Sequence, residues 1–232
     1  MAKKKNIVVL TGAGISAESG IQTFRDAGGL WEGYDVQEVA SPEGWRRNRA
    51  LVLDFYNQRR RQLLTVKCNE AHKALVDLES QYEVCIITQN IDNLHEQAGS
   101  KRVVHLHGEL LKARSTTDTS LIYDWTKDIN VGDKCEKGGQ LRPHIVWFGE
   151  DVPMIATAAA LTSIADILII IGTSMQVYPA AGLVHYAQPR TPIYFIDPKP
   201  SINENDYYDL TVVAEKATVG VRKVVDKLLT NT

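Results

Sequence analysis

The stretch NIVVLTGAGISAESG, residues 6–20, decides the fold expected for this chain. It begins with a short apolar run, which is typical of a strand buried on both faces of a parallel sheet. Gly12 and Gly14 follow the run, and glycines at such a strand end permit a tight turn and close approach of the backbone to a phosphate. The third glycine falls later than in the dinucleotide fingerprint of dehydrogenases, and no acidic residue ends a strand about 20 residues on. A dehydrogenase is therefore disfavoured.

Four further apolar runs have the same character. They are YEVCIIT at 82–88, RVVHLHG at 102–108, ADILIIIG at 165–172 and PIYFIDP at 192–198. Helix-like segments separate most of them, such as 71–79 with apolar Ala74, Leu75 and Leu78. This alternation predicts an α/β fold with a Rossmann-like, doubly wound parallel sheet. Two regions interrupt it: 31–67 has helical patterns and no convincing strand, and 112–140 is polar and rich in turns.

Composition limits the cellular setting and the partners. The 232 residues carry a formal net charge of −2 with both signs mixed, so neither nucleic acid nor a membrane is an expected partner. The apolar run after the lysines at the start of the chain is too short for an export signal, and no stretch is long enough to span a membrane. Three scattered cysteines fit a reducing compartment. We expect a soluble, cytoplasmic protein of one large domain.

Polar residues follow several of the predicted strands. Gln89-Asn90-Ile91-Asp92-Asn93 comes after the second run, Gly172-Thr173-Ser174 after the fourth, and Asp197 ends the fifth, where its carboxylate could accept a ribose hydroxyl. His105 and His107 alternate at the end of the third. A metal pair is conceivable there, but no cysteine or carboxylate of suitable spacing joins them. Each of these two histidines is otherwise interpreted as a hydrogen-bonded structural residue or as a general base.

The stretch DFYNQRRRQ at 54–62 places arginines in a helical pattern. The apolar stripe through Tyr56 and Leu63 passes through Arg59. Arg59 either lies along the edge of the core or has a functional role, while Arg60 and Arg61 are expected on a solvated face. A second ambiguous stretch is RPHIVWFGE at 142–150, which is either a buried strand or a groove that pairs with an extended peptide.

Taken together, the motifs resemble those of one family. GAGISAESGI, TFRD, TQNIDNLH, LHGEL, RPHIVWFGE and GTSMQVYPAAGL occur in the order found in sirtuins, the NAD-dependent protein-lysine deacylases, and the resemblance extends from Ile7 to about Val225. It implies a single catalytic domain over 1–232. The Rossmann-like, NAD-binding part is 1–30, 68–111 and 141–232, the helical insert of the small domain is 31–67, and 112–140 is the remnant of a zinc module.

The resemblance also implies the site residues. His107 and Asn90 are the implied catalytic residues, with His107 as general base. The implied NAD-binding residues are Gly12, Ala13, Gly14, Ala17, Glu18, Thr23, Phe24, Arg25, Trp31, Gln89, Asn90, Ile91, Asp92, His107, Gly172, Thr173, Ser174, Asp197, Pro198, Lys199 and Ala217. The implied substrate-binding residues are Tyr56, Arg59, Val146, Trp147, Phe148, Gly149, Glu150 and Val177. The substrate is an acyl-lysine protein bound as an extended peptide.

The implied reaction gives free lysine, nicotinamide and 2′-O-acyl-ADP-ribose. Sirtuins that remove acidic acyl groups carry a Tyr and an Arg three residues apart on a helix, which here are Tyr56 and Arg59, so desuccinylase and demalonylase activity above deacetylase activity is expected. The alternatives are a protein ADP-ribosyltransferase of divergent sirtuin type and a non-catalytic NAD-sensing module.

One departure from the family concerns zinc. Ser115 and Lys137 stand where two of the family's four zinc-binding cysteines are expected, and only Cys135 lies nearby. One thiol cannot build a four-coordinate structural site, so no zinc is expected. The segment is instead expected to be held by packing of Leu121, Ile122, Tyr123 and Trp125. The sequence leaves the oligomeric state open.

Overall fold

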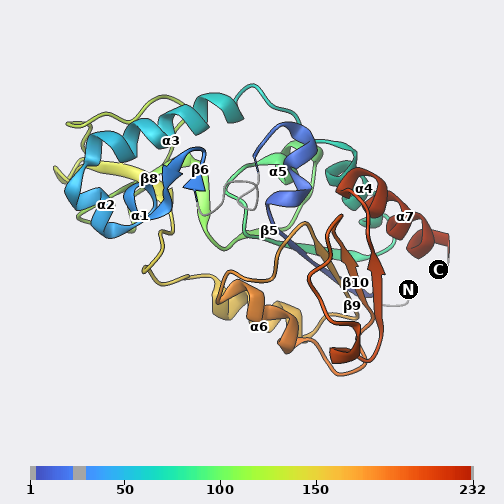
Figure 1. The fold of residues 1–232 in the computed structure, drawn as a ribbon. Coiled ribbons are helices and arrows are strands. Elements are labelled where there is room, and N and C mark those ends of the chain that lie inside the picture. The colour runs from blue at the N-terminus through green and yellow to red at the C-terminus, as the bar shows by residue number, and fades with distance from the viewer. Residues whose placement is uncertain (1–3, 23–29, 231–232) are drawn as a thin grey trace.

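A computed structural model describes residues 4–22 and 30–230. Its largest element is a six-stranded sheet in which all neighbouring strands are parallel (Figure 1). Side by side, the strands are β11 (Leu210–Val213), β10 (Ile193–Ile196), β9 (Ile167–Ile171), β1 (Asn6–Thr11), β4 (Glu83–Thr88) and β5 (Val103–His105). The predicted Rossmann-like sheet is confirmed. The sequence patterns did not indicate β11, whose residues are all only partly buried.

The strand order reverses at the centre of the sheet. From β1 the chain continues to β4 and β5 on one side, and β9, β10 and β11 follow on the other. In open α/β sheets, ligands bind in the crevice beyond the carboxyl ends of the strands at such a reversal. Here that crevice lies beyond Thr11 and Ile171, the last residues of β1 and β9.

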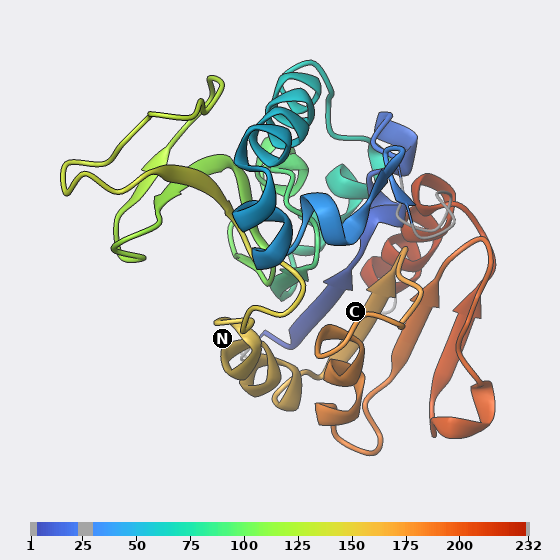
Figure 2. The ribbon, with the colours of Figure 1, turned by 60° about the vertical axis from the view of Figure 1, so that its left-hand side comes forward.

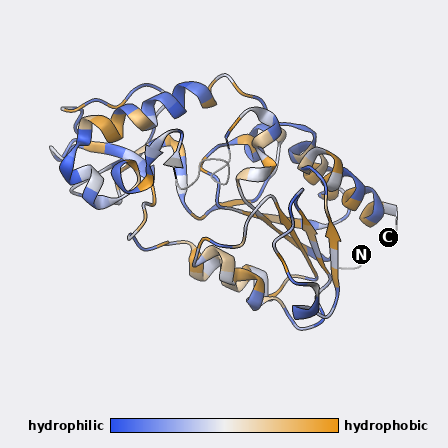
Figure 3. Ribbon diagram, viewed as in Figure 1, coloured by the Kyte–Doolittle hydropathy of each residue, from blue (hydrophilic) through white to orange (hydrophobic). Residues whose placement is uncertain are grey.

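Alternate residues of β1 pack into two separate cores. Ile7 and Val9 point into one core, and Val8 and Leu10 into the other. The first core is covered by α4 (Glu70–Leu78) and α7 (Ala217–Thr230), and the second by α6 (Ile155–Ser163) and the 3₁₀ helix η4 (Ala180–Tyr186). Because side chains alternate across a strand, a sheet covered on both faces needs continuous apolar runs. The strands are accordingly mostly orange in Figure 3.

A second body, here called the small domain, has its own core. It combines α1 (Val36–Val39), α2 (Pro42–Arg47) and α3 (Arg49–Leu63) with an antiparallel sheet of β6 (Gly108–Ser115), β7 (Ile122–Asp124) and β8 (Leu141–Ile145) (Figure 2). The helical pattern at 31–67 is confirmed. The expectation of no strand there is wrong, because β2 (Leu30–Trp31) and β3 (Tyr34–Asp35) form a short antiparallel pair.

Polar side chains fix where the small-domain helices begin. Ser41 accepts a hydrogen bond from the Gly44 amide and Pro42 occupies the first turn of α2. Asn48 accepts one from the Leu51 amide at the start of α3. Such caps satisfy amides that have no partner within the helix.

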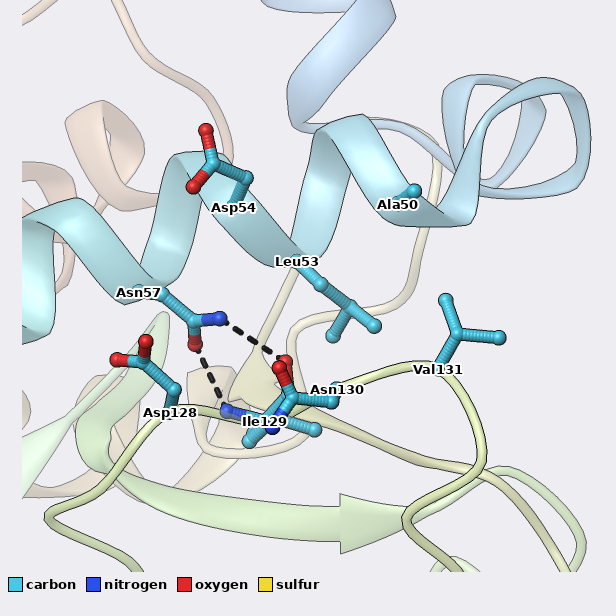
Figure 4. A pocket seen from close by; sticks show the side chains of 8 residues that line it. All are labelled: Ala50, Leu53, Asp54, Asn57, Asp128, Ile129, Asn130 and Val131. Atoms are coloured by element: carbon cyan, nitrogen blue, oxygen red, sulfur yellow. Dashed lines mark hydrogen bonds between the residues drawn. The ribbon is translucent and has the colours of Figure 1, made fainter.

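Asn57, a buried side chain of α3, holds the loop around Ile129. Asn57 donates from Nδ2 to the Ile129 carbonyl and accepts from the Ile129 amide at Oδ1, both at 2.9 Å (Figure 4). A hollow of about 170 Å³ lies beside this contact, between α3 and residues 128–131. None of the predicted site residues lines it.

Three of the four side chains predicted to hold residues 112–140 by packing do lie against the core. Leu121, Tyr123 and Trp125 pack against the small-domain core, as expected. Ile122 is 44% exposed, so the expectation that it packs there is wrong. It lies on β7 with its side chain on the opposite face from those of its neighbours, because side chains alternate along a strand.

Arg60 is another correction to the sequence-based expectation. Its side chain is fully buried rather than solvated. Nε donates to the Leu110 carbonyl at 3.1 Å, and Nη1 donates to Oδ1 of Asn57 at 2.7 Å. Arg60 is four residues from Tyr56 and three from Leu63, so it borders the stripe of Tyr56 and Leu63 on one side, as Arg59 does on the other. Arg61 is exposed as expected and pairs with Asp128 at 2.6 Å.

We expect Asn57→Ala to destabilise the protein by about 3 kcal/mol, because three buried hydrogen bonds lose their shared partner. Thermal unfolding should show a midpoint lowered by roughly 6 to 12 °C. Asp54→Ala, on the exposed face of the same helix, should leave the midpoint nearly unchanged. Equal midpoints for the two variants would show that the Asn57 contact does not hold the loop.

No helix in residues 4–22 or 30–230 combines the length and apolar character needed to cross a bilayer.

Candidate functional site

The loops after β1 and β9 meet at the reversal of the strand order. The Gly12 amide donates to the Ile171 carbonyl at 3.0 Å, and the Gly14 amide donates to the Gly172 carbonyl at 2.9 Å. A Cβ on Gly14 would lie 2.5 Å from the Cα of Gly172, so only glycine fits this approach. Gly172 itself has a φ of +61°. The glycines therefore bring the two loops together at the crevice, and all three were predicted site residues.

A buried hydroxyl connects two predicted residues of the loop after β4. Asn90 donates from Nδ2 to Ser16 Oγ at 3.1 Å, and Ser16 donates to Asp92 Oδ2 at 2.9 Å. Burial raises the pKa of Asp92, although bonds from the Leu94 amide and Ser16 oppose this. Ser16 is fully buried and was missed from the sequence. Its signal was a small polar residue two positions after Gly14.

His107 lies beyond β5 at the same edge of the sheet. Its Nδ1 is 2.9 Å from the Gln89 carbonyl oxygen, which can only accept a hydrogen bond. Nδ1 therefore carries the hydrogen and donates, and Nε2 is the basic nitrogen. Burial lowers the pKa of His107 below its ordinary value of 6.5, outweighing the bond to Gln89. The imidazole is therefore neutral at pH 7, as a general base must be.

His105 has a different environment. Its Nδ1 contacts the Asn90 carbonyl at 3.1 Å and its Nε2 pairs with Glu96 at 2.8 Å. Although burial alone would lower it, the pKa of His105 is raised by Glu96. The two histidines thus bond to consecutive carbonyls of one loop and do not share a ligand. No group of three or more His, Cys, Asp or Glu residues in the described ranges is arranged to hold a metal ion.

Other predicted residues lie at this edge or next to it. Gln89 donates from Nε2 to Thr173 Oγ1 at 3.2 Å, and buried Asp197 accepts from the Lys199 amide at 2.8 Å. Both carboxylate oxygens of Glu18 bind Thr218 at the start of α7, so this side chain joins two elements of the fold.

The remaining predicted NAD-binding residues differ in burial. Ala13 and Ser174 are partly buried, Ala217 is buried, and Ala17, Pro198 and Lys199 are exposed. Thr23, Phe24 and Arg25 lie outside the described residues.

Tyr56 and Arg59 both project from α3 into the core of the small domain. Tyr56 is fully buried, with Trp31 and Phe55 packed edge-on against its ring at centroid distances of 5.9 and 5.1 Å. Trp31 was predicted to contact NAD, and the structure places its ring in this aromatic cluster. Burial raises the pKa of Tyr56, so the phenol keeps its proton, and Arg59 is among the charges near enough to affect it.

The side chain of Arg59 is only 13% exposed. Nη1 donates to the Phe55 carbonyl at 2.7 Å, and Nη2 is 3.7 Å from Glu32, which is a long ion pair. Nε is buried and has no partner among the described residues. Burial lowers the pKa of Arg59, and Glu32 opposes the shift. A buried cation with an unused N–H is costly, and an anionic ligand would satisfy it.

The apolar stretch at 146–148 follows β8 and is not part of it. The Val146 amide donates to the His107 carbonyl at 2.9 Å, which fixes this stretch beside His107. Trp147 is buried, whereas Phe148 is 43% exposed. Gly149 has a φ of +88° and turns the chain so that Glu150 reaches back to the Trp147 amide at 2.8 Å. Val177, which was predicted to contact the substrate from the other side, is half-buried in the segment after β9.

The chemistry of the edge suits a dinucleotide. Hydroxyls of Ser16 and Thr173, amides of Gln89 and Asn90 and the carboxylate of Asp197 are partners for ribose and phosphate oxygens, and the glycine loops allow close backbone approach.

Known proteins resemble this chain over nearly its whole length. The model of the Sir2 family matches residues 12–179. An "NAD-dependent protein deacylase" of Helicobacter pylori strain J99 is 57% identical over 225 residues, which cover 97% of this chain and 96% of that protein. A solved Sir2 homologue in complex with NAD has a TM-score of 0.87 and 36% identity, covering 99% of this chain and 91% of its own. A Sir2 protein bound to an acetylated peptide has a TM-score of 0.80 and 28% identity, covering 97% and 94%. The chain therefore belongs to the Sir2 family, the sirtuins.

Proposed function

We propose that this protein is an NAD-dependent protein-lysine deacylase that prefers succinyl- and malonyl-lysine to acetyl-lysine. The products are free lysine, nicotinamide and 2′-O-acyl-ADP-ribose. The observation that carries the deacylase assignment is His107, a neutral imidazole whose Nδ1–H is bonded to the Gln89 carbonyl and whose Nε2 is left as a base. The relatives named as NAD-dependent deacylases support the same activity.

The residues of the crevice would hold NAD and position it. Gly12, Gly14 and Thr173 suit the phosphates and adenosine ribose, and Asn90 and Asp92 suit the nicotinamide ribose. When bound, NAD supplies a glycosidic bond whose cleavage releases nicotinamide. Nε2 of His107 would accept a proton from a ribose hydroxyl. The bond from Nδ1–H to the Gln89 carbonyl holds the imidazole in the tautomer that leaves Nε2 free to do so.

The preference for acidic acyl groups rests on Tyr56 and Arg59. Three residues apart on α3, they share one helix face. A phenol that keeps its proton donates one hydrogen bond to a carboxylate, and a guanidinium with an unused buried N–H adds a charge-assisted bond. An acetyl group has no carboxylate and gains neither bond.

The substrate backbone is proposed to run as an extended strand between residues 146–150 and the segment around Val177. Exposed Phe148 and the turn at Gly149 support this, because they leave the outer side of the segment accessible. The Sir2 protein solved with an acetylated peptide supports binding of the substrate as a peptide.

Product analysis separates this proposal from its rivals. Incubation with isotopically labelled NAD and a succinyl-lysine peptide should release nicotinamide only when the peptide is present, and mass spectrometry should find succinyl-ADP-ribose and the free peptide. Label attached to protein would instead indicate an ADP-ribosyltransferase. Binding of NAD without any nicotinamide release would indicate a sensing module.

We further propose that the protein folds without zinc. Ser115 Oγ lies 3.2 Å from the Sγ of Cys135, so a hydroxyl bonds to the one thiol of the module. One thiol falls short of the four ligands of a structural zinc site. Elemental analysis of the purified protein should find well under one zinc per chain, with unchanged thermal unfolding in the presence of a chelator. A stoichiometric metal that a chelator removes with loss of folding would contradict this.

A further inference from the structure

We propose that Trp147 is a positioning residue for acyl selectivity, acting through the hydroxyl of Tyr56. The proposal rests on the acid-selective function above and adds a residue to it. Trp147 Nε1 lies 3.0 Å from Tyr56 Oη, and both side chains are buried. The contact joins α3 to the segment after β8, which are 91 residues apart in sequence.

The direction of this hydrogen bond follows from the chemistry of the two groups. An indole N–H donates and never accepts, whereas a phenol oxygen can do both. Trp147 therefore donates, and Tyr56 accepts. The proton of Tyr56 must point elsewhere, and among the bonds of the described residues none uses it as a donor. A carboxylate only accepts, so the phenol is set in the one orientation that suits an acidic acyl group.

Trp147 is itself fixed by a cluster of charges, here called the Glu150 cluster. Glu150 accepts from Arg142 at 2.6 Å, from Arg114 at 3.1 Å and from the Trp147 amide at 2.8 Å. The Arg142 guanidinium lies 3.2 Å from the centroid of the Trp147 ring, in a cation–π contact. Trp45 also packs against the Trp147 indole, at a centroid distance of 5.6 Å.

The charges of the Glu150 cluster persist across the working pH range. Burial alone would raise the pKa of Glu150, but the bond and charge of Arg142 lower it. Burial lowers the pKa of Arg142 to about 10, so it remains cationic at neutral pH. The indole is thus held from its backbone amide and from one ring face, which leaves it little freedom to turn its N–H away from Tyr56.

The same arrangement links the two halves of substrate recognition. Residues 146–150 are the proposed wall for the peptide backbone, and Tyr56 is part of the proposed acid-binding pair. Because Trp147 belongs to the first and bonds to the second, the orientation of the phenol is determined by the segment that contacts the peptide. Glu150, predicted as a substrate contact, has its carboxylate occupied by this cluster.

A double-mutant cycle tests the proposal. The readout is the ratio of kcat/KM for a succinyl peptide to that for the matched acetyl peptide, with thermal unfolding measured for each variant. Trp147→Phe keeps a ring and removes the N–H, and it should lower the ratio about tenfold through a higher KM for the succinyl peptide. In a Tyr56→Phe background, the same change should alter the ratio by less than about twofold, since no hydroxyl remains to be oriented.

Two controls separate loss of the Trp147–Tyr56 hydrogen bond from general damage to the core. Trp45→Phe removes the indole N–H of another buried tryptophan of the same core, keeps a ring against Trp147, and should leave the ratio within about twofold. If Trp147→Phe fails to fold, 3-benzothienylalanine at position 147 replaces the N–H by sulfur with almost no change of shape. Equal losses from the Trp147 change with and without the Tyr56 hydroxyl would overturn the proposal. A wild-type protein with no preference for the succinyl peptide would instead refute the acid-selective function itself.

Discussion

His107→Ala is expected to lower kcat/KM for every acyl peptide by a factor of about 10² to 10⁴, the range that loss of a general base produces. The loss should be equal for succinyl and acetyl substrates, because the base acts on the ribose and not on the acyl group. Steady-state nicotinamide release with both peptides measures it. His185→Ala, which changes an exposed histidine, is the matched control and should lose little activity.

The pH profile gives the same residue an independent signature. Only the neutral imidazole accepts a proton, so activity is full above the pKa of His107 and falls as pH drops through it. Burial places that pKa below 6.5. The acid limb of kcat/KM should therefore lie below pH 6.5. A limb that begins above pH 7, or the same limb in His107→Ala, would contradict the assignment of the base.

Arg59→Met should reverse the substrate preference. Desuccinylation and demalonylation should fall at least about 100-fold, on the order of 3 kcal/mol, because the acyl carboxylate loses its charged partner. Deacetylation should change by less than about threefold, since methionine keeps an apolar side chain of similar length. The measurement is kcat/KM for the three peptides in parallel.

The control for Arg59→Met comes from the same helix. Arg61→Met also removes one positive charge from α3, but its side chain is exposed and pairs with Asp128. It should leave all three activities nearly unchanged. A proportional loss of all three activities in Arg59→Met would show that Arg59 supports the fold and does not select the acyl group.

Most of the large sheet could be predicted from sequence because it is buried on both faces. Five of its six strands appear as continuous apolar runs, and burial on two faces demands such runs. The edge strand β11 escaped because it is only four residues long and Thr211 interrupts its apolar residues; partial burial is not the reason, since β5 at the other edge is also only partly buried. The pair β2 and β3 escaped because two residues per strand are too few to show a period.

Helical periodicity alone could not predict which of Arg59 and Arg60 is more deeply buried. Both lie on the face of α3 marked by Tyr56 and Leu63, at spacings of three and four residues, so the pattern cannot say which is more buried. Arg60 is fully buried because Asn57 Oδ1 and the Leu110 carbonyl accept its N–H groups. Leu110 is 50 residues away in sequence, and no local signal reports such a partner.

Some residues of the site could likewise be predicted from sequence, and others could not. Glycines at strand ends and His107 carry a signal of their own, because residue type and position at the sheet edge both point to a ligand. Ser16 and the bond from Trp147 to Tyr56 depend on how separate segments meet, so they became visible only in three dimensions.

Nicotinamide release by the wild-type protein, with acetyl, malonyl, succinyl and glutaryl versions of one lysine peptide, tests the central claim most directly. If Tyr56 and Arg59 bind the acyl carboxylate, kcat/KM for the succinyl and malonyl peptides should exceed that for the acetyl peptide by at least about tenfold. An acetyl value equal to or above the succinyl value would contradict acid selectivity and leave an ordinary deacetylase.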